Sequence, residues 1–104
     1  VTIITIHTRP KSSINNLSLT KNNDNHYVLL NWSYPQSEEV KRYVLYRAVE
    51  GTSFVSYKSI PVGENSFKDY RIRKGIKYEY TIKVVYNTGK QTPFSNIVSA
   101  SLEE

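Results

Sequence analysis

Six acidic side chains come first as candidates for chemistry, because hydrolysis of a glycosidic bond needs two carboxyl groups facing each other. These side chains are Glu38, Glu39, Glu50, Glu64, Asp69 and Glu79. All but Glu79 fall in or beside segments with the composition of turns, where we expect an acidic group to meet water. The arrangement predicts no pair of catalytic carboxylates.

Nucleophilic catalysis and metal binding have no better starting point. His7 and His26 are the two histidines, and neither Ser33 nor Ser66 lies in a Gly-x-Ser-x-Gly pattern that would hold a nucleophile beside a base. Two separated histidines with no acidic cluster make a poor zinc site, and the run Asn22–Asn25 lacks the glycine and glutamate of a calcium-binding loop. We therefore predict that the chain is not an enzyme and has no catalytic residue, metal or cofactor.

The strongest charged pattern is basic. Five basic residues follow one another closely: Lys68, Arg71, Arg73, Lys74 and Lys77. Such a group could hold sulfate, phosphate or uronate, with arginine favouring bidentate contacts. Arg71, Arg73 and Lys74 are therefore predicted binding residues, with a solvated turn as the alternative. The remaining basic residues behind the net charge of +5 are scattered, so no nucleic-acid partner is predicted.

A regular alternation identifies one element that must position such residues. Its apolar members recur with a period of two: Tyr78, Tyr80, Ile82, Val84 and Tyr86. Successive side chains of a strand point to opposite faces, so these five share one face, while the intervening polar residues share the other. The pattern is typical of a half-buried antiparallel strand.

Six further segments have the composition of strands. They are residues 14–20, 27–34, 41–49, 54–60, 66–69 and 95–102. Turn signals separate the segments at intervals of roughly 8–12 residues, and no helical period is present. We predict an all-β fold, a seven-stranded antiparallel β-sandwich. The residues predicted for its core are Trp32, Tyr43, Leu45, Tyr78, Ile82 and Val84.

Composition sets limits on the class of protein. The 104 residues are enough for one domain with one core. The absence of cysteine excludes a disulfide framework and a thiolate metal site. No apolar run approaches the ~20 residues needed to cross a bilayer, so no membrane insertion is predicted.

The outer face of the predicted sheet offers a second candidate surface. If Tyr43 and Leu45 point inward, then Val44 and Tyr46 point outward, and Val85 points the same way. An apolar patch rimmed by charged residues could contact a neighbouring domain or a glycan. The alternative is cross-strand packing that only stabilises the sheet. The predicted rim consists of Lys41, Lys83 and Glu79.

Six short motifs, in order, resemble those of a fibronectin type III module. They are Leu30-x-Trp32, Tyr43-Val-Leu45-Tyr-Arg47, Gly51-Thr-Ser-Phe54, Ser66-Phe67-Lys-Asp69, Gly75-x-x-Tyr78 and Ser95-Asn96-x-Val98. The second has the form common in bacterial extracellular modules. The fifth resembles the tyrosine corner, which implies that the Tyr78 hydroxyl bonds to upstream backbone. The resemblance covers about residues 10–102 and implies an immunoglobulin-like sandwich with fibronectin type III topology.

An immunoglobulin domain is the nearest alternative, but it would have a cysteine pair and a tryptophan on its third strand. Trp32 lies on the predicted second strand. The chain also lacks an Arg-Gly-Asp adhesion motif and the Trp-Ser-x-Trp-Ser box of cytokine receptors.

The resemblance implies a domain division and a function. Residues 1–9 are expected to be a tail, a linker or the end of a preceding domain, and residues 10–104 the sandwich. The expected function is a non-catalytic spacer or interaction module that positions neighbouring domains of a larger extracellular or cell-surface protein. The alternative is a module that binds a polysaccharide or another protein through Val44, Tyr46 and Val85 or through the basic turn, Arg71–Lys74.

Overall fold

A computed structural model describes residues 13–35 and 37–102. Within these ranges the chain forms seven β-strands and no helix. The strands are β1 (Ser18–Asn22), β2 (Tyr27–Asn31), β3 (Val40–Val49), β4 (Val55–Pro61), β5 (Ser66–Asp69), β6 (Tyr78–Tyr86) and β7 (Val98–Ala100). The predicted segment before residue 10 lies outside the described residues.

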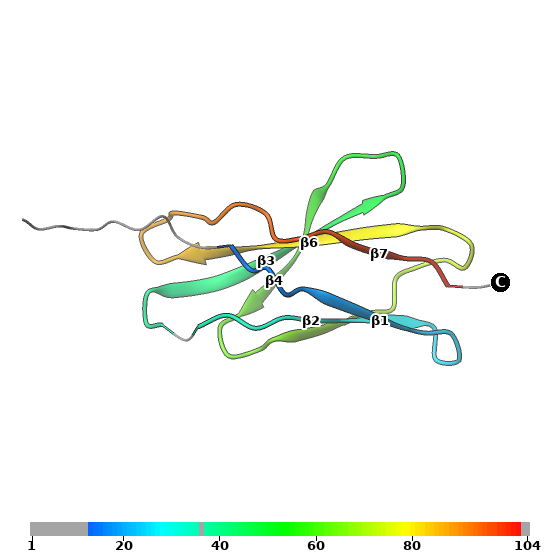
Figure 1. The fold of residues 1–104 in the computed structure, drawn as a ribbon, viewed down its shortest axis with the longest axis horizontal. Coiled ribbons are helices and arrows are strands. Elements are labelled where there is room, and N and C mark those ends of the chain that lie inside the picture. Colours follow the sequence, from blue (N-terminus) through cyan, green and yellow to red (C-terminus); the bar gives the residue numbers. More distant parts are fainter. Residues whose placement is uncertain (1–12, 36, 103–104) are drawn as a thin grey trace, which may run out of the picture.

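The strands form two antiparallel sheets that pack face to face, as Figure 1 shows. One sheet has the order β1-β2-β5 and the other the order β4-β3-β6-β7. The hairpin that joins β3 and β4 extends away from the two layers. The architecture is the predicted seven-stranded antiparallel β-sandwich.

The core lies between the sheets and is built from alternate residues of the long strands. The six residues predicted for it are each at most 6% exposed. Val28 and Leu30 of β2 meet them from the smaller sheet, and the Trp32 ring packs edge-on against Tyr43, with 5.8 Å between ring centroids. Burial of these aromatic and aliphatic side chains is the main term that stabilises the sandwich.

Three strands are shorter than their apolar residues predict. Ile14 and Leu17 are buried but precede β1, the buried Trp32 follows β2, and the buried Leu102 follows β7. The side chain of Asn96 replaces part of the expected ladder: it accepts from the Leu17 amide at 3.1 Å and donates to the Leu17 carbonyl at 2.9 Å. An asparagine that bonds to backbone offers the chain an alternative to a regular strand.

The connection from β5 to β6 contains the predicted tyrosine corner. The Tyr78 hydroxyl accepts a hydrogen bond from the backbone amide of Arg73 at 3.0 Å. Gly75 has a φ of 81°, a left-handed conformation that favours glycine, and its amide donates to the Leu102 carbonyl at 2.8 Å. These contacts fix the basic turn between the two sheets.

Candidate functional site

The outer face of the four-stranded sheet carries a shallow groove of about 410 Å³. We call it the outer groove. Its lining residues come from β3, β4 and β6 and from the segment after β6: Arg42, Val44, Tyr46, Ser56, Tyr57, Lys58, Ser59, Val85 and Gln91. The predicted surface residues Val44, Tyr46 and Val85 all belong to it.

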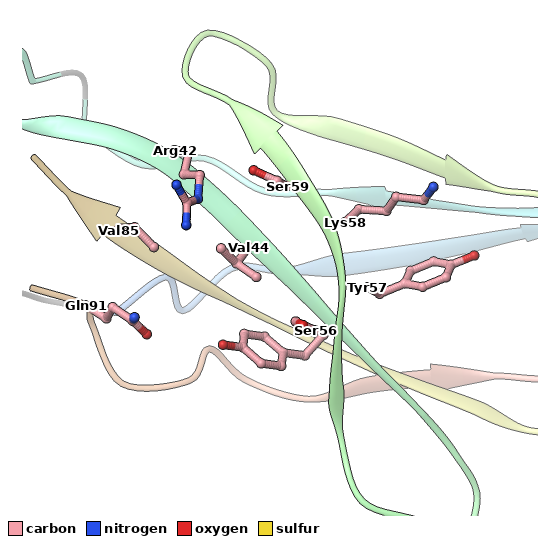
Figure 2. A pocket seen from close by; sticks show the side chains of 9 residues that line it. Arg42, Val44, Ser56, Tyr57, Lys58, Ser59, Val85 and Gln91 are labelled. Carbon is pink, nitrogen blue, oxygen red and sulfur yellow. The ribbon is translucent and has the colours of Figure 1, made fainter. Parts of the chain in front are cut away.

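Strand register explains why these residues meet. Arg42 lies opposite Val85 on β6, and Val44 lies opposite Ser59 on β4. Residues directly opposite each other in an antiparallel pair share one face of the sheet. The outward positions of β3 therefore form the middle of the groove, with β4 on one side and β6 on the other, as Figure 2 shows.

A β-bulge shapes one wall of the outer groove. The register between β3 and β4 shifts between Leu45 and Tyr46, so that Ser56 pairs with Tyr46 although Ser59 pairs with Val44. A bulge inserts an extra residue and re-aims the side chains around it. As a result both serines reach the outer face, while Tyr57 turns towards the other sheet.

The groove differs from the apolar patch expected from the sequence. Val85 is only 6% exposed, so it forms part of the floor and offers little contact area of its own. The Tyr46 ring is packed edge-on against Phe94, with 5.0 Å between ring centroids, and the Lys83 ammonium lies 4.3 Å from the Phe94 centroid. Lys83 is therefore held over an aromatic ring and does not form a free rim.

Arg42 is the most unusual side chain in the outer groove. Its Nε is buried and has no hydrogen-bond partner, and its guanidinium bonds to no residue in the described part of the chain. Figure 2 shows it beside Val85 and Val44, with Gln91 on the far side of Val85. A buried polar atom without a partner is rare, because it has lost water without gaining a replacement.

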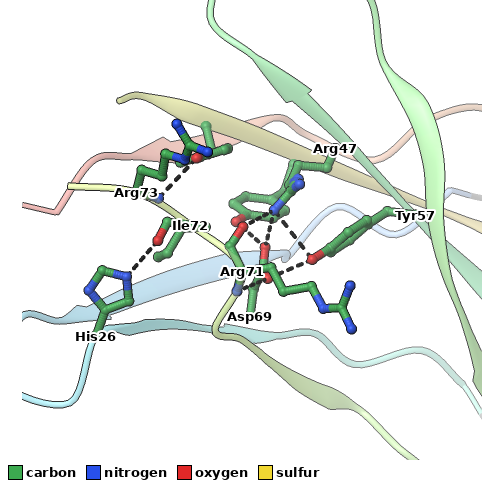
Figure 3. Close-up of polar contacts among 9 residues, drawn as sticks. His26, Arg47, Tyr57, Asp69, Arg71, Ile72 and Arg73 are labelled. Atoms are coloured by element: carbon green, nitrogen blue, oxygen red, sulfur yellow. Dashed lines mark hydrogen bonds and ion pairs between the residues drawn. The ribbon is translucent and has the colours of Figure 1, made fainter. Parts of the chain in front are cut away.

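A second polar cluster lies in the interior and joins the two sheets. We call it the Asp69 cluster: Asp69 of β5, Arg47 of β3, Tyr57 of β4 and Tyr80 of β6 (Figure 3). Asp69 accepts hydrogen bonds from the hydroxyls of Tyr57 (2.7 Å) and Tyr80 (2.6 Å), and it forms an ion pair with Arg47 at 3.0 Å. The backbone amide of Arg71 gives it a fourth bond, at 3.0 Å.

Burial and hydrogen bonding set the protonation of the Asp69 cluster. Desolvation and the bond to Asp69 raise the pKa of Tyr57 to about 12, and the same causes raise the pKa of Tyr80 above its ordinary value. Burial alone would lower the pKa of Arg47, but the charge of Asp69 raises it. Arg47 therefore stays charged and both tyrosines stay neutral near pH 7.

The carboxylate of Asp69 was expected to meet water, and this prediction is wrong. Asp69 is 1% exposed, and all of its bonds go to other parts of the sandwich. The signal that could have found its partner is the position of Arg47, which has the same parity on β3 as the inward-facing Tyr43 and Leu45. The cluster holds the fold together and leaves no carboxylate oxygen free for acid–base chemistry.

The two arginines of the basic turn do not point towards one another. Arg71, Arg73 and Lys74 are all exposed. Figure 3 shows the side chains of Arg71 and Arg73 extending in opposite directions from the turn. These two guanidinium groups therefore do not converge on one anion, although Arg71 and Lys68 line a small pocket together with Lys58.

Other chemistry finds no support in the described residues. In residues 13–35 and 37–102, no group of three histidine, cysteine or acidic side chains could hold a metal ion. His26 donates from Nε2 to the Ile72 carbonyl at 2.5 Å, which ties the β1–β2 turn to the basic turn. His7 lies outside the described residues. The same part of the chain contains no helix able to cross a membrane.

Comparison with solved structures identifies the architecture. The sixth fibronectin type III domain of a human fibronectin type III domain-containing protein superposes with a TM-score of 0.75, at 18% identity over 95% of this chain and 91% of that domain. The chain has the fibronectin type III fold. A fibronectin type III-like protein from Clostridium thermocellum agrees, with a TM-score of 0.70, 18% identity and coverage of 89% and 94%.

The fibronectin type III fold also matches part of a longer protein. A pectate lyase from Erwinia chrysanthemi, solved in complex with tetragalacturonic acid, superposes with a TM-score of 0.72 and 23% identity. The match covers 86% of this chain but only 28% of the lyase. No family model and no curated protein sequence matches the chain.

Proposed function

We propose that this fibronectin type III fold is a non-catalytic spacer and interaction module of a larger extracellular or cell-surface protein, where it positions neighbouring domains. The observation that carries the proposal is the match to 28% of a pectate lyase chain, in which the same fold is one part of a longer polypeptide. Bacterial origin and extracellular location are part of the same proposal.

The path of the chain through the sandwich supports a spacer. Figure 1 shows the first described residues towards one end of the long axis and the last described residues at the other. A sandwich that the chain enters and leaves at opposite ends separates whatever is attached to it by its own length. A flexible linker of equal residue count would instead give a broad distribution of distances.

The hydrogen bonding of the buried carboxylate supports a role without catalysis. Asp69, the one fully buried carboxylate of the described residues, is saturated by hydrogen bonds. A catalytic acid or base needs access to a reacting proton.

The proposal is tested on the native polypeptide and on an engineered tandem. An antibody raised against the domain should capture a polypeptide with a mass far above the 12.0 kDa of this chain. Dyes on two carrier domains fused at its ends should report one narrow distance, whereas a Gly/Ser linker of 104 residues should report a broad one. A native mass near 12 kDa, or a broad distance for the sandwich, would overturn the proposal.

A further inference from the structure

We infer that the outer groove is a binding site for a carboxylate-bearing glycan, with Arg42 as the residue that binds the carboxylate of a uronate unit. This inference goes beyond the spacer role, because it assigns a ligand class to one face of the sandwich. It rests on the charge of the groove, on the state of Arg42 and on the chemistry of the groove walls.

Charge gives the first part of the argument. The charged residues that line the outer groove are Arg42 and Lys58, both cationic, and no acidic residue lines it. The Lys58 ammonium lies 5.5 Å from the centroid of the Tyr57 ring, which leaves Arg42 as the cation beside the valine floor. An anion entering the groove would therefore meet positive potential and no repulsion from its lining.

The state of Arg42 gives the second part. Its Nε is buried without a partner, and no described residue accepts a bond from its guanidinium. A guanidinium presents five donors in a planar fork, and a carboxylate is the planar anion that matches two of them at once. A carboxylate in the groove would satisfy guanidinium donors that the sandwich leaves unsatisfied.

The walls of the groove favour a glycan over a peptide. Strand β3, which forms its middle, is hydrogen-bonded on both sides, to β4 and to β6. A peptide therefore cannot add to β3 as a new strand, which is the usual way that a sheet binds extended peptides; the edge strand that lines the groove is β4, and a strand added there would lie beside the groove and not over its floor. Recognition must use side chains, and the hydroxyls of Ser56 and Ser59 and the amide of Gln91 are suited to sugar hydroxyls.

The floor and the size of the groove agree with this class of ligand. Val44 and Val85 provide an apolar floor between the polar walls, as Figure 2 shows. A sugar ring has apolar C–H faces as well as polar edges, so it can lie on Val44, the more exposed of the two valines, while its hydroxyls reach the walls. The volume of about 410 Å³ is in the range of roughly 300–1,000 Å³ usual for small-ligand sites.

The test is a titration of the 104-residue chain with a galacturonate trimer. Calorimetry measures the affinity, and the NMR amide resonances of β3, β4 and β6 show where the trimer binds. We expect saturable binding with shifts confined to these strands. The methyl-esterified trimer, which lacks the carboxylates, should not bind. Arg42→Gln should weaken binding by roughly 10- to 100-fold, as the loss of a charged hydrogen-bond pair does.

A matched variant distinguishes binding in the outer groove from non-specific attraction between the anionic trimer and the basic protein. Arg73→Gln removes the same charge from an exposed residue of the basic turn, and its affinity should stay within about twofold of the parent. Equal thermal midpoints for both variants and the parent would show that neither change has acted through unfolding.

Three results would overturn the inference. They are the absence of saturable binding, equal weakening by Arg42→Gln and Arg73→Gln, and tighter binding of a hexaglutamate peptide than of the trimer. None of these would touch the spacer proposal, which is decided by the native mass and the inter-domain distance.

Discussion

The substitution Asp69→Asn tests the interior of the sandwich most directly. It keeps the size and shape of the side chain but removes its charge and replaces one acceptor oxygen by an amide that donates. Asp69 accepts from four groups, and Arg47 and Tyr80 share the oxygen Oδ2. Whichever oxygen is replaced, two of the four donors lose their acceptor.

The burial of the cluster sets the magnitude. The side chain of Asp69 is 1% exposed and that of Arg47 is 20% exposed, so the guanidinium would remain largely desolvated without its counter-ion. Breaking a buried ion pair by removing one partner costs about 3–5 kcal/mol, because the remaining charge is left unpaired. Since whole domains are stable by about 5–15 kcal/mol, the variant should unfold at a much lower urea concentration.

Urea denaturation followed by the fluorescence of Trp32, the single tryptophan, gives the free energy of unfolding. Glu64→Gln is the matched control, because it makes the same chemical change on an exposed residue and should alter stability by at most about 0.5 kcal/mol. A double-mutant cycle with Arg47→Met should show a coupling energy above about 1 kcal/mol, the upper end for a surface pair. A loss below about 1 kcal/mol for Asp69→Asn would refute the reasoning.

Three further outcomes follow from the structure. Above pH 10 the unfolded chain ionises its tyrosines, while burial and the bond to Asp69 keep Tyr80 protonated in the folded state. The stability that Tyr80 contributes is therefore complete below pH 10 and is lost as the pH rises. The free energy of unfolding should fall by about 1.4 kcal/mol per pH unit. Tyr57 is more exposed and contributes a smaller part of this pH-dependent loss of stability. In the Tyr80→Phe variant the urea midpoint should therefore fall less steeply between about pH 10 and 11. The same slope as in the parent would contradict this prediction. Trp32→Ala should cost roughly 3–5 kcal/mol, measured by circular dichroism, and a midpoint equal to the parent's would contradict its place in the core. Tyr78→Phe removes the acceptor of the Arg73 amide and should lower the free energy of unfolding in urea by about 1 kcal/mol. The control Tyr70→Phe changes an exposed ring and should cause no measurable loss. Equal losses for the two variants would count against the tyrosine corner.

The regular part of the fold could be predicted because strand periodicity is local. The bounds of β5 and β6 agree with the sequence prediction residue for residue, those of β3 differ by one residue at its start, and those of β4 differ by one residue at each end. In β6 the five alternate residues from Tyr78 to Tyr86 are all buried, so the apolar period is strong and the register is strongly specified. The outward direction of Val44 and Tyr46 follows from the same parity.

The last strand was predicted too long because side chains in this segment accept hydrogen bonds that the backbone of a regular strand would accept. The hydroxyl of Thr92 accepts from the Val84 amide and that of Ser95 from the Ile82 amide, each at 3.0 Å. These hydroxyls occupy donors of β6 that a regular strand would use, so β7 begins only at Val98. Nothing in the local composition of Ser95–Leu102 indicates which donors are already taken.

The candidate site could be predicted only in part, because its form depends on contacts between distant segments. Parity placed Val44, Tyr46 and Val85 on one face, but it missed Arg42, which has the same parity, and the β-bulge that brings Ser56 and Ser59 to that face. Phe94, which covers Tyr46, comes from a segment 48 residues later in the chain. The burial of Asp69 was not predicted, because it lies on a short strand beside a turn, and it is the facing sheet that removes its carboxylate from water.

The bonds that tie one sheet to the other contain no sulfur. Four strands meet at Asp69 through oxygen and nitrogen atoms alone, and the chain has no cysteine. Such a tie forms as soon as the sheets pack, without an oxidant, an isomerase or a choice among pairings. The sandwich should therefore reach the same folded state in a reducing cytosol and in an oxidising medium, and a thiol reductant should leave its melting temperature unchanged.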